Sequence, residues 1–196
     1  MLIVRGMSQP ALPVVMPEKF GAVAIALHWM VAVLVVCAAV SGLVTANVDE
    51  AAATQQSLSV HQSLGFTVFV LIVIRATWRL THPPPPLPDS TPPAQRIAAG
   101  VTHITMYLIL LALPVAGYLS LAARGRAVTL YGLVEIPMWM PLNFQLASQA
   151  LAVHGLGGYV LYGLFVLHVG AALYHRLVLN DGILERMWPQ RRPAHD

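Results

Sequence analysis

Residues 154–175 read HGLGGYVLYGLFVLHVGAALYH, within a longer stretch, 136–175, that contains no Asp, Glu, Lys or Arg. A membrane-spanning helix needs about 20 mostly apolar residues, so this stretch predicts one spanning helix over about 150–179. His154 and His168 are 14 residues apart, which at about 100° per residue brings both to nearly the same face, about 21 Å apart along the axis. One helix is therefore expected to present two imidazoles on one face, near opposite sides of the bilayer.

Three other stretches of the chain also lack charged residues: Phe20–Val48, Ala51–Ile74 and Ile97–Ala123. Hydrophobic residues make up 57% of the 196 residues and charged residues only 10%, against roughly 25% charged in soluble domains. A soluble domain of this size could not bury so much apolar surface, and a disordered chain would be richer in charge. We therefore expect an all-α integral membrane four-helix bundle, with helices over about 20–45, 58–80, 97–122 and 150–179.

The ends of the chain and one internal linker differ from the apolar stretches. We expect an N-terminal tail over 1–19, a four-helix transmembrane domain over 20–189 and a C-terminal tail over 190–196. The run Pro83–Pro86 begins an extended linker between the second and third helices, because proline lacks the amide hydrogen that a helix needs. Val44-Thr45-Ala46 loosely resembles a signal-peptidase site, but the apolar stretch before it is longer than a signal peptide requires, so we expect the first helix to be retained.

The basic residues predict the orientation, because Lys and Arg are enriched in cytoplasmic loops. Nine lie on one side of the expected helices: Arg5, Lys19, Arg75, Arg79, Arg96, Arg176, Arg186, Arg191 and Arg192. Only Arg124 and Arg126 lie on the other side. Both termini are therefore expected in the cytoplasm. The basic residues form no patch, which argues against a nucleic-acid partner, and the single cysteine excludes a disulfide framework or a cysteine-based metal centre.

Histidines in the expected helices fall into two pairs of matching depth. His28 lies nine residues after Lys19, and His168 lies eight residues before Arg176, so both are near the cytoplasmic ends of their helices. His61 and His154 are both near the outer ends. His103, near the cytoplasmic end of the third helix, is the alternative partner that could replace His28.

Two pairs of facing imidazoles indicate two haem groups. An axial imidazole on each face holds a low-spin iron, and the core of a helical bundle accommodates the porphyrin. Zinc usually takes four ligands, and a proton relay usually recruits Asp or Glu, which the expected helices lack. Because the chain has no CxxCH sequence, the haem would be non-covalent haem b. A haem-free bundle remains the alternative. Arg75 either extends to the interface or contacts a haem propionate.

Several motifs resemble the prokaryotic cytochrome b561 family over about residues 19–189. They are Leu27-His28-Trp29, His61 with Gly65, Arg75 with Arg79, the proline linker, Leu113-Pro114-Val115-Ala116-Gly117, Arg124-Gly125, and His154 through His168 to His175. The resemblance implies an inner-membrane protein with two haem b groups, bound by His28 with His168 and by His61 with His154. This agrees with the pairing by depth.

The resemblance also implies electron exchange with quinone, and one branch of the family oxidises superoxide while reducing ubiquinone. It places the quinone near His175, with Arg79 or Arg96 supplying the positive charge. Arg124 and Arg126 either steer superoxide, a small anion, towards the outer haem or lie in an ordinary solvated loop. The alternative function is a cytochrome b subunit that passes electrons for a membrane dehydrogenase or hydrogenase and needs a redox partner protein.

Overall fold

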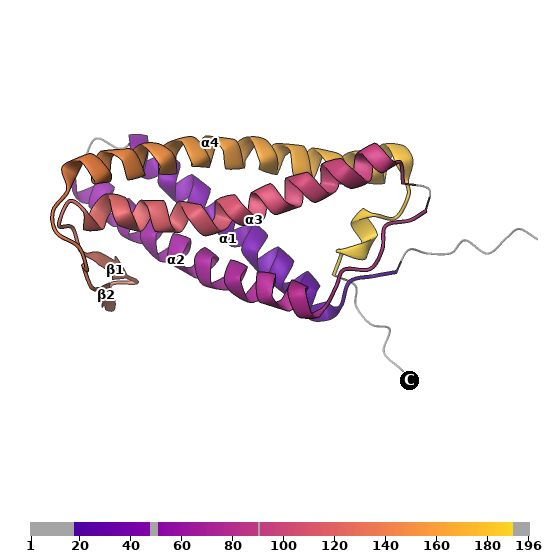
Figure 1. Ribbon diagram of the computed structural model, residues 1–196, viewed down its shortest axis with the longest axis horizontal. Coiled ribbons are helices and arrows are strands. Elements are labelled where there is room, and N and C mark those ends of the chain that lie inside the picture. Colours follow the sequence, from indigo (N-terminus) through magenta and orange to yellow (C-terminus); the bar gives the residue numbers. More distant parts are fainter. Residues whose placement is uncertain (1–17, 48–50, 90, 190–196) are drawn as a thin grey trace, which may run out of the picture.

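Four long helices form the body of the protein in a computed structural model that describes residues 18–47, 51–89 and 91–189 (Figure 1). They are α1 (Ala22–Asn47), α2 (Ala51–Thr81), α3 (Pro93–Ala122) and α4 (Phe144–Tyr174). Each is long and apolar enough to cross a membrane. The prediction of an all-α membrane bundle is therefore confirmed. Most of the two expected tails, residues 1–17 and 190–196, lies outside the described residues.

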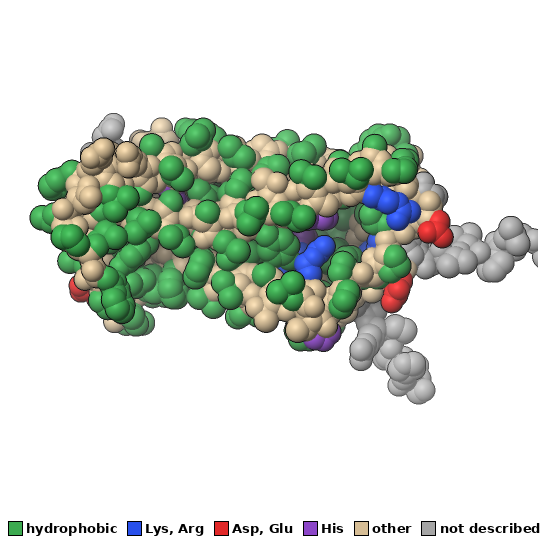
Figure 2. All heavy atoms as spheres, in the orientation of Figure 1, with side chains coloured by type: hydrophobic (Ala, Val, Ile, Leu, Met, Phe, Trp, Pro, Cys, Tyr) green, Lys and Arg blue, Asp and Glu red, His purple; other side chains and the backbone are tan. Residues whose placement is uncertain are grey.

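The helices pack as two pairs. α1 lies against α2 and α3 against α4, whereas α1 and α4 make little direct contact. The buried cluster between the pairs draws on all four helices: Val31, Val68, Ile72, Leu110 and Leu161. Large apolar side chains are exposed on all four helices and spread over the face shown in Figure 2, as expected for helices that face lipid. His28 of α1 and His168 of α4 nevertheless lie close to each other, with 6.1 Å between their ring centres.

Three helices begin earlier than the spacing of charges predicts. The expected starts were about residues 58, 97 and 150, but α2 begins at Ala51, α3 at Pro93 and α4 at Phe144. Proline is favoured in the first turn of a helix, where its missing amide hydrogen costs nothing. The Asn143 side chain caps α4 by accepting a 2.9 Å hydrogen bond from the amide of Leu146. Apolar length identifies the spanning segment, and the helices continue beyond it.

A small antiparallel hairpin, absent from the sequence-based expectation, follows α3. Its strands are β1 (Val128–Leu130) and β2 (Val134–Ile136). The turn between them places Tyr131 and Gly132 at positive φ, 53° and 69°. Tyr131 fixes the hairpin to α2, because its amide donates a 2.8 Å hydrogen bond to Ser63 Oγ and its hydroxyl bonds to Thr67 Oγ1. The hairpin thus closes one end of the bundle.

The other end of the bundle gathers both ends of the described chain and the proline linker (Figure 1). After α4 come a π-helical turn, η1 (His175–Leu179), and a 3-10 turn, η2 (Leu184–Arg186). The Phe20 amide donates to the Arg186 carbonyl oxygen at 3.2 Å. That this end faces the cytoplasm stays a prediction from the distribution of Lys and Arg, and three of those residues (Arg5, Arg191 and Arg192) lie outside the described residues.

Candidate functional site

His61 of α2 and His154 of α4 face each other at the hairpin end of the bundle. Their ring centres are 5.8 Å apart and their planes are nearly perpendicular, at 89°. The Nδ1 of His61 lies 2.8 Å from the Ala38 carbonyl oxygen, and the Nδ1 of His154 lies 2.8 Å from that of Leu113. A carbonyl oxygen can only accept, so each Nδ1 carries the proton and each Nε2 keeps its lone pair. Both rings therefore offer the nitrogen that binds a metal.

Two glycines make room for these rings. A Cβ at Gly42 would lie 2.9 Å from Cε1 of His61, and a Cβ at Gly117 would lie 3.1 Å from Cε1 of His154. The distance at Gly42 is shorter than real Cβ contacts, and the distance at Gly117 is tighter than most of them. Each histidine is thus packed against the bare backbone of a neighbouring helix, α1 for His61 and α3 for His154.

If His61 and His154 hold a haem, as the sequence predicts, Gly42→Ala should weaken its binding by about tenfold, because the added methyl pushes the His61 ring off its hydrogen bond to Ala38. Haem titration of the purified apoprotein measures this. Gly100→Ala in α3 is the matched control, since its Cβ would meet nothing within 4 Å. Equal haem affinity in the two variants would show that the glycine contact does not hold the ring.

A cavity of about 790 Å³ surrounds this pair. Its walls are apolar and aromatic for the most part and include Phe66, Phe69, Tyr159 and Tyr162. Arg124 and Arg126, the two basic residues expected on the outer side, also line it. Arg126 donates a 2.9 Å hydrogen bond to Gln55 Oε1, whereas the Arg124 side chain has no such bond within the described residues. The structure therefore brings the His61/His154 pair and both arginines into one cavity.

Three histidines meet at the opposite end. His28 of α1 lies 6.1 Å from His168 of α4 between ring centres, and His103 of α3 lies 5.3 Å from the same ring. The structure thus brings the expected pair together and keeps the alternative partner beside it. On the face shown in Figure 2 the surface is hollowed toward this end, and histidine and basic side chains show in the hollow.

Arg75 lies inside the bundle beside this cluster. It donates a 2.9 Å hydrogen bond to Nδ1 of His28, and its guanidinium lies over the Tyr107 ring, 5.7 Å from the centroid. The buried Tyr107 hydroxyl has no partner in hydrogen-bond geometry among the described residues. Arg75 therefore does not extend to the membrane surface, and two polar groups point into the space beside His28.

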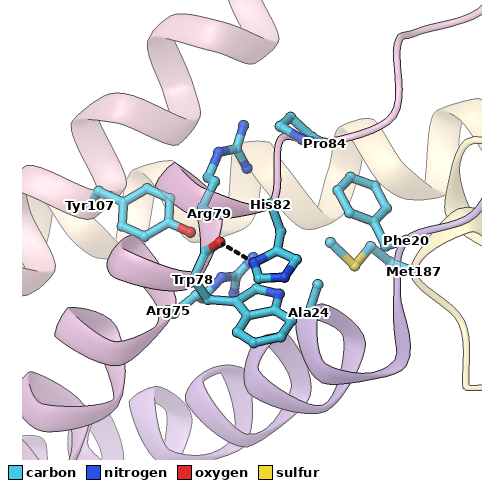
Figure 3. Close-up of a pocket in the computed structure, with 9 residues that line it drawn as sticks. All are labelled: Phe20, Ala24, Arg75, Trp78, Arg79, His82, Pro84, Tyr107 and Met187. Carbon is cyan, nitrogen blue, oxygen red and sulfur yellow. Dashed lines mark hydrogen bonds between the residues drawn. The ribbon is translucent and has the colours of Figure 1, made fainter.

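Arg79 lines a separate small cavity with Arg75, Tyr107 and the stacked rings of Trp78 and His82, which are 3.7 Å apart (Figure 3). Its volume is about 20 Å³, which suffices for a water molecule but not for an aromatic ring. The Arg96 guanidinium is already hydrogen-bonded within the linker, because it donates to the carbonyl oxygens of Thr91 and Pro88. Neither arginine has a hydrogen bond or ion pair with His175 in the described part of the chain.

His175 opens the π-helical turn after α4 and pairs with a residue that the sequence did not single out. Its Nδ1 lies 2.6 Å from Oδ2 of Asp181. Asp181, Gly42, Gly117 and Tyr107 were all missed as site residues. Gly117 stands in one of the quoted motifs, but nothing in a single sequence indicates that His154 lies against it. The six-residue separation of His175 and Asp181 likewise matches no fixed helical spacing.

Comparison with known proteins agrees with this geometry. Residues 19–190 match the family model of prokaryotic cytochrome b561. Cytochrome b561 homolog 2 of Escherichia coli (strain K12) is 33% identical over 174 residues, covering 87% of this chain and 92% of that protein. The probable superoxide oxidase CybB of Yersinia pestis is 33% identical over 177 residues, covering 90% of this chain and 99% of that protein. The chain therefore belongs to the prokaryotic cytochrome b561 family, whose members are haem-containing membrane proteins of electron transport.

Proposed function

We propose that this protein is a superoxide:ubiquinone oxidoreductase with two haem b groups. His61 and His154 would hold one haem iron near the hairpin, and His28 and His168 the other near the C-terminal segment. The relative named as a probable superoxide oxidase supports the choice of substrate. The observation that carries the proposal is the large cavity, which combines a histidine pair with the two arginines of that end.

The spacing of both histidine pairs fits bis-histidine haem. In each pair the two ring centres are far enough apart for one haem iron to be held between the two imidazoles. The observed distances are 5.8 and 6.1 Å. At the hairpin end the hydrogen bonds to Ala38 and Leu113 already fix the required tautomer, as supporting hydrogen bonds do for metal-bound histidines. Haem b bound there supplies a one-electron carrier at each pair.

At the other pair, Arg75 holds His28 in the opposite tautomer. The arginine can only donate, so Nδ1 of His28 accepts and its Nε2 carries the proton. To bind iron through Nε2, His28 must move its proton to Nδ1, and Arg75 must turn to another acceptor. A haem propionate is that acceptor in our proposal, and the hydroxyl of Tyr107, whose ring lies against the Arg75 guanidinium, is a second donor beside it. His103 stays the alternative ligand to His168.

Arg124 and Arg126 have the charge and the position to attract superoxide. Both line the cavity around His61 and His154, and a cationic cleft with apolar walls raises the encounter rate of an anion. Arg124 is the stronger candidate, because Gln55 already occupies part of the Arg126 guanidinium. At the opposite end, quinone would be reduced beside His175, with Arg79 as the source of positive charge, because the Arg96 guanidinium already donates to the carbonyl oxygens of Thr91 and Pro88.

We expect Arg124→Gln to lower the second-order rate of haem reduction by superoxide about tenfold and to weaken its dependence on ionic strength. Haem content should stay at the wild-type level, since Arg124 contacts neither histidine ring. Stopped-flow absorbance with enzymatically generated superoxide measures the rate. Arg176→Gln, at the other end of the bundle, is the control and should reduce at the wild-type rate.

The same experiment decides between the two candidate functions. If superoxide fails to reduce the wild-type haem while quinone reoxidises it, the superoxide step is wrong. The chain would then act as the cytochrome b subunit of a membrane dehydrogenase or hydrogenase, with its electrons supplied by a partner protein.

A further inference from the structure

We infer that Asp181 is a positioning residue for quinone protonation, because it holds the His175 ring with one nitrogen facing away from the carboxylate. The inference rests on the proposed function, which places quinone reduction at this end of the bundle. Nothing in the family match or in the names of the relatives assigns a role to Asp181.

The hydrogen bond between His175 and Asp181 is short, and a backbone amide helps to hold the carboxylate in place. Nδ1 of His175 donates to Oδ2 of Asp181 at 2.6 Å, and the side chains are only 15% and 24% exposed. The other oxygen, Oδ1, accepts a hydrogen bond from the Ile183 amide at 3.2 Å. Both carboxylate oxygens are therefore occupied, which fixes the plane of the carboxylate and with it the plane of the imidazole.

A π-helical turn followed by a left-handed residue brings Asp181 to His175. α4 ends in the π-helical turn η1, and Asn180 follows in the left-handed conformation, with φ 47° and ψ 43°. The amides of Asn180 and Asp181 both donate a hydrogen bond to the carbonyl oxygen of His175, and the bond from Asp181 is 3.4 Å long. A π-helical turn is uncommon and frequently occurs at functional sites, and Asn is one of the few residues that readily adopts the left-handed conformation at a helix end. Here they fold the carboxylate back onto the ring six residues before it.

Other charged groups near this turn are paired elsewhere. Arg176 bonds Glu185 Oε1 at 3.0 Å through Nε and Asn180 Oδ1 at 3.0 Å through Nη1. Tyr174 meets the His175 ring only edge-on, with 6.2 Å between ring centres. The carboxylate of Asp181 is therefore the polar partner of His175 within the described residues, and Nε2 is left for a ligand.

The arrangement suits repeated proton transfer. Reduction of a quinone to a quinol takes two electrons and two protons. When protonated His175 contacts one quinone oxygen, its Nε2–H bond breaks and an O–H bond forms, while the Nδ1–H bond to Asp181 is kept. The neutral ring left behind is the tautomer that regains a proton at Nε2 from water. The second quinone oxygen takes its proton from water, and the two electrons come from the haem groups of the proposed function.

The test is reoxidation of chemically reduced holoprotein by a short-chain ubiquinone, followed by haem absorbance in a stopped-flow instrument. We expect Asp181→Asn to lower the limiting rate about tenfold and His175→Ala to lower it about a hundredfold. Haem per chain and haem spectra should stay unchanged in both variants, and the half-saturating quinone concentration should stay unchanged in Asp181→Asn. Asp181→Glu should recover part of the rate, because it restores the carboxylate.

Two comparisons separate positioning from a structural effect. In the double variant, Asp181→Asn should add nothing to His175→Ala, since the two residues act as one unit. Glu185→Gln is the matched control, because it removes a carboxylate from the same segment without touching His175, and it should reoxidise at the wild-type rate. Additive losses in the double variant, or lost haem in Asp181→Asn, would overturn the inference.

The outcomes also separate this inference from the proposed function. Wild-type haem that quinone cannot reoxidise would overturn both. Wild-type haem that quinone reoxidises at the same rate in Asp181→Asn would overturn the role of Asp181 alone. Failure of superoxide to reduce the haem, with the quinone results as expected, would leave the role of Asp181 supported.

Discussion

Replacing His154 with alanine should leave one haem b per chain instead of two and abolish reduction by superoxide. The variant removes one of two facing imidazoles, 5.8 Å apart in the native protein, and a single axial histidine does not hold the low-spin iron of a bis-histidine site. Haem is counted by the pyridine haemochrome assay against protein concentration. The His28/His168 pair, at the far end of α4, should keep its haem and its spectrum.

His82→Ala is the control for this experiment. His82 is an exposed histidine stacked on Trp78, outside both pairs, so its loss should leave two haem groups. Two haem groups in His154→Ala would refute the pairing at the hairpin end. At the other end, comparing His28→Ala with His103→Ala identifies the partner of His168. The variant that loses the second haem has lost that partner.

The spans of this protein could be predicted because charge is so scarce. Each break between helices coincides with Asp, Glu, Lys or Arg, and lipid forces the segments between them to be helical. The shared face of His154 and His168 followed from helical periodicity alone. The depth argument also placed His61 beside His154, which the structure shows at contact distance.

The remaining features depend on contacts between segments, which periodicity does not reveal. How far α1 is rotated about its axis decides that Gly42, rather than a neighbour, lies against His61. The hairpin was missed because each strand has only three residues, although the alternating VTLYGLVEI with its Tyr-Gly turn carried a signal. Asp181 was missed because it meets His175 only through a π turn and a left-handed residue.

Arg186 should prove the most sensitive position for stability at the end of the bundle that holds the proline linker. It is 2% exposed, and it donates hydrogen bonds to the carbonyl oxygens of Glu18, Pro85 and Pro86 at 2.8, 2.6 and 3.0 Å. Proline has no amide hydrogen, and an extended proline segment makes no internal hydrogen bonds. The carbonyl oxygens of Pro85 and Pro86 therefore take these hydrogen bonds from a donor elsewhere in the chain.

The guanidinium also lies over the Phe20 ring, 5.4 Å from the centroid. Burial lowers the pKa of Arg186 from its ordinary value, while the nearby Glu18 carboxylate acts in the opposite direction. An arginine stays protonated at any physiological pH, so the hydrogen bonds remain charge-assisted. Arg186 thus joins the chain before α1, the linker before α3 and the segment after α4.

We expect Arg186→Leu to lower the free energy of unfolding by about 3 kcal/mol, because it removes a buried guanidinium that donates hydrogen bonds to three carbonyl oxygens of two separate segments. This corresponds to a fall in Tm of about 10 °C for a chain of this size, measured by circular dichroism in detergent. Arg186→Lys should recover less than half of the loss, since an ammonium group cannot reproduce the planar fork of the guanidinium.

Arg176→Leu is the matched control. The Arg176 side chain is 50% exposed in its pair with Glu185, so its loss should cost less than about 1 kcal/mol. Equal Tm values for Arg186→Leu and Arg176→Leu would mean that the linker is held by its apolar contacts and not by the guanidinium.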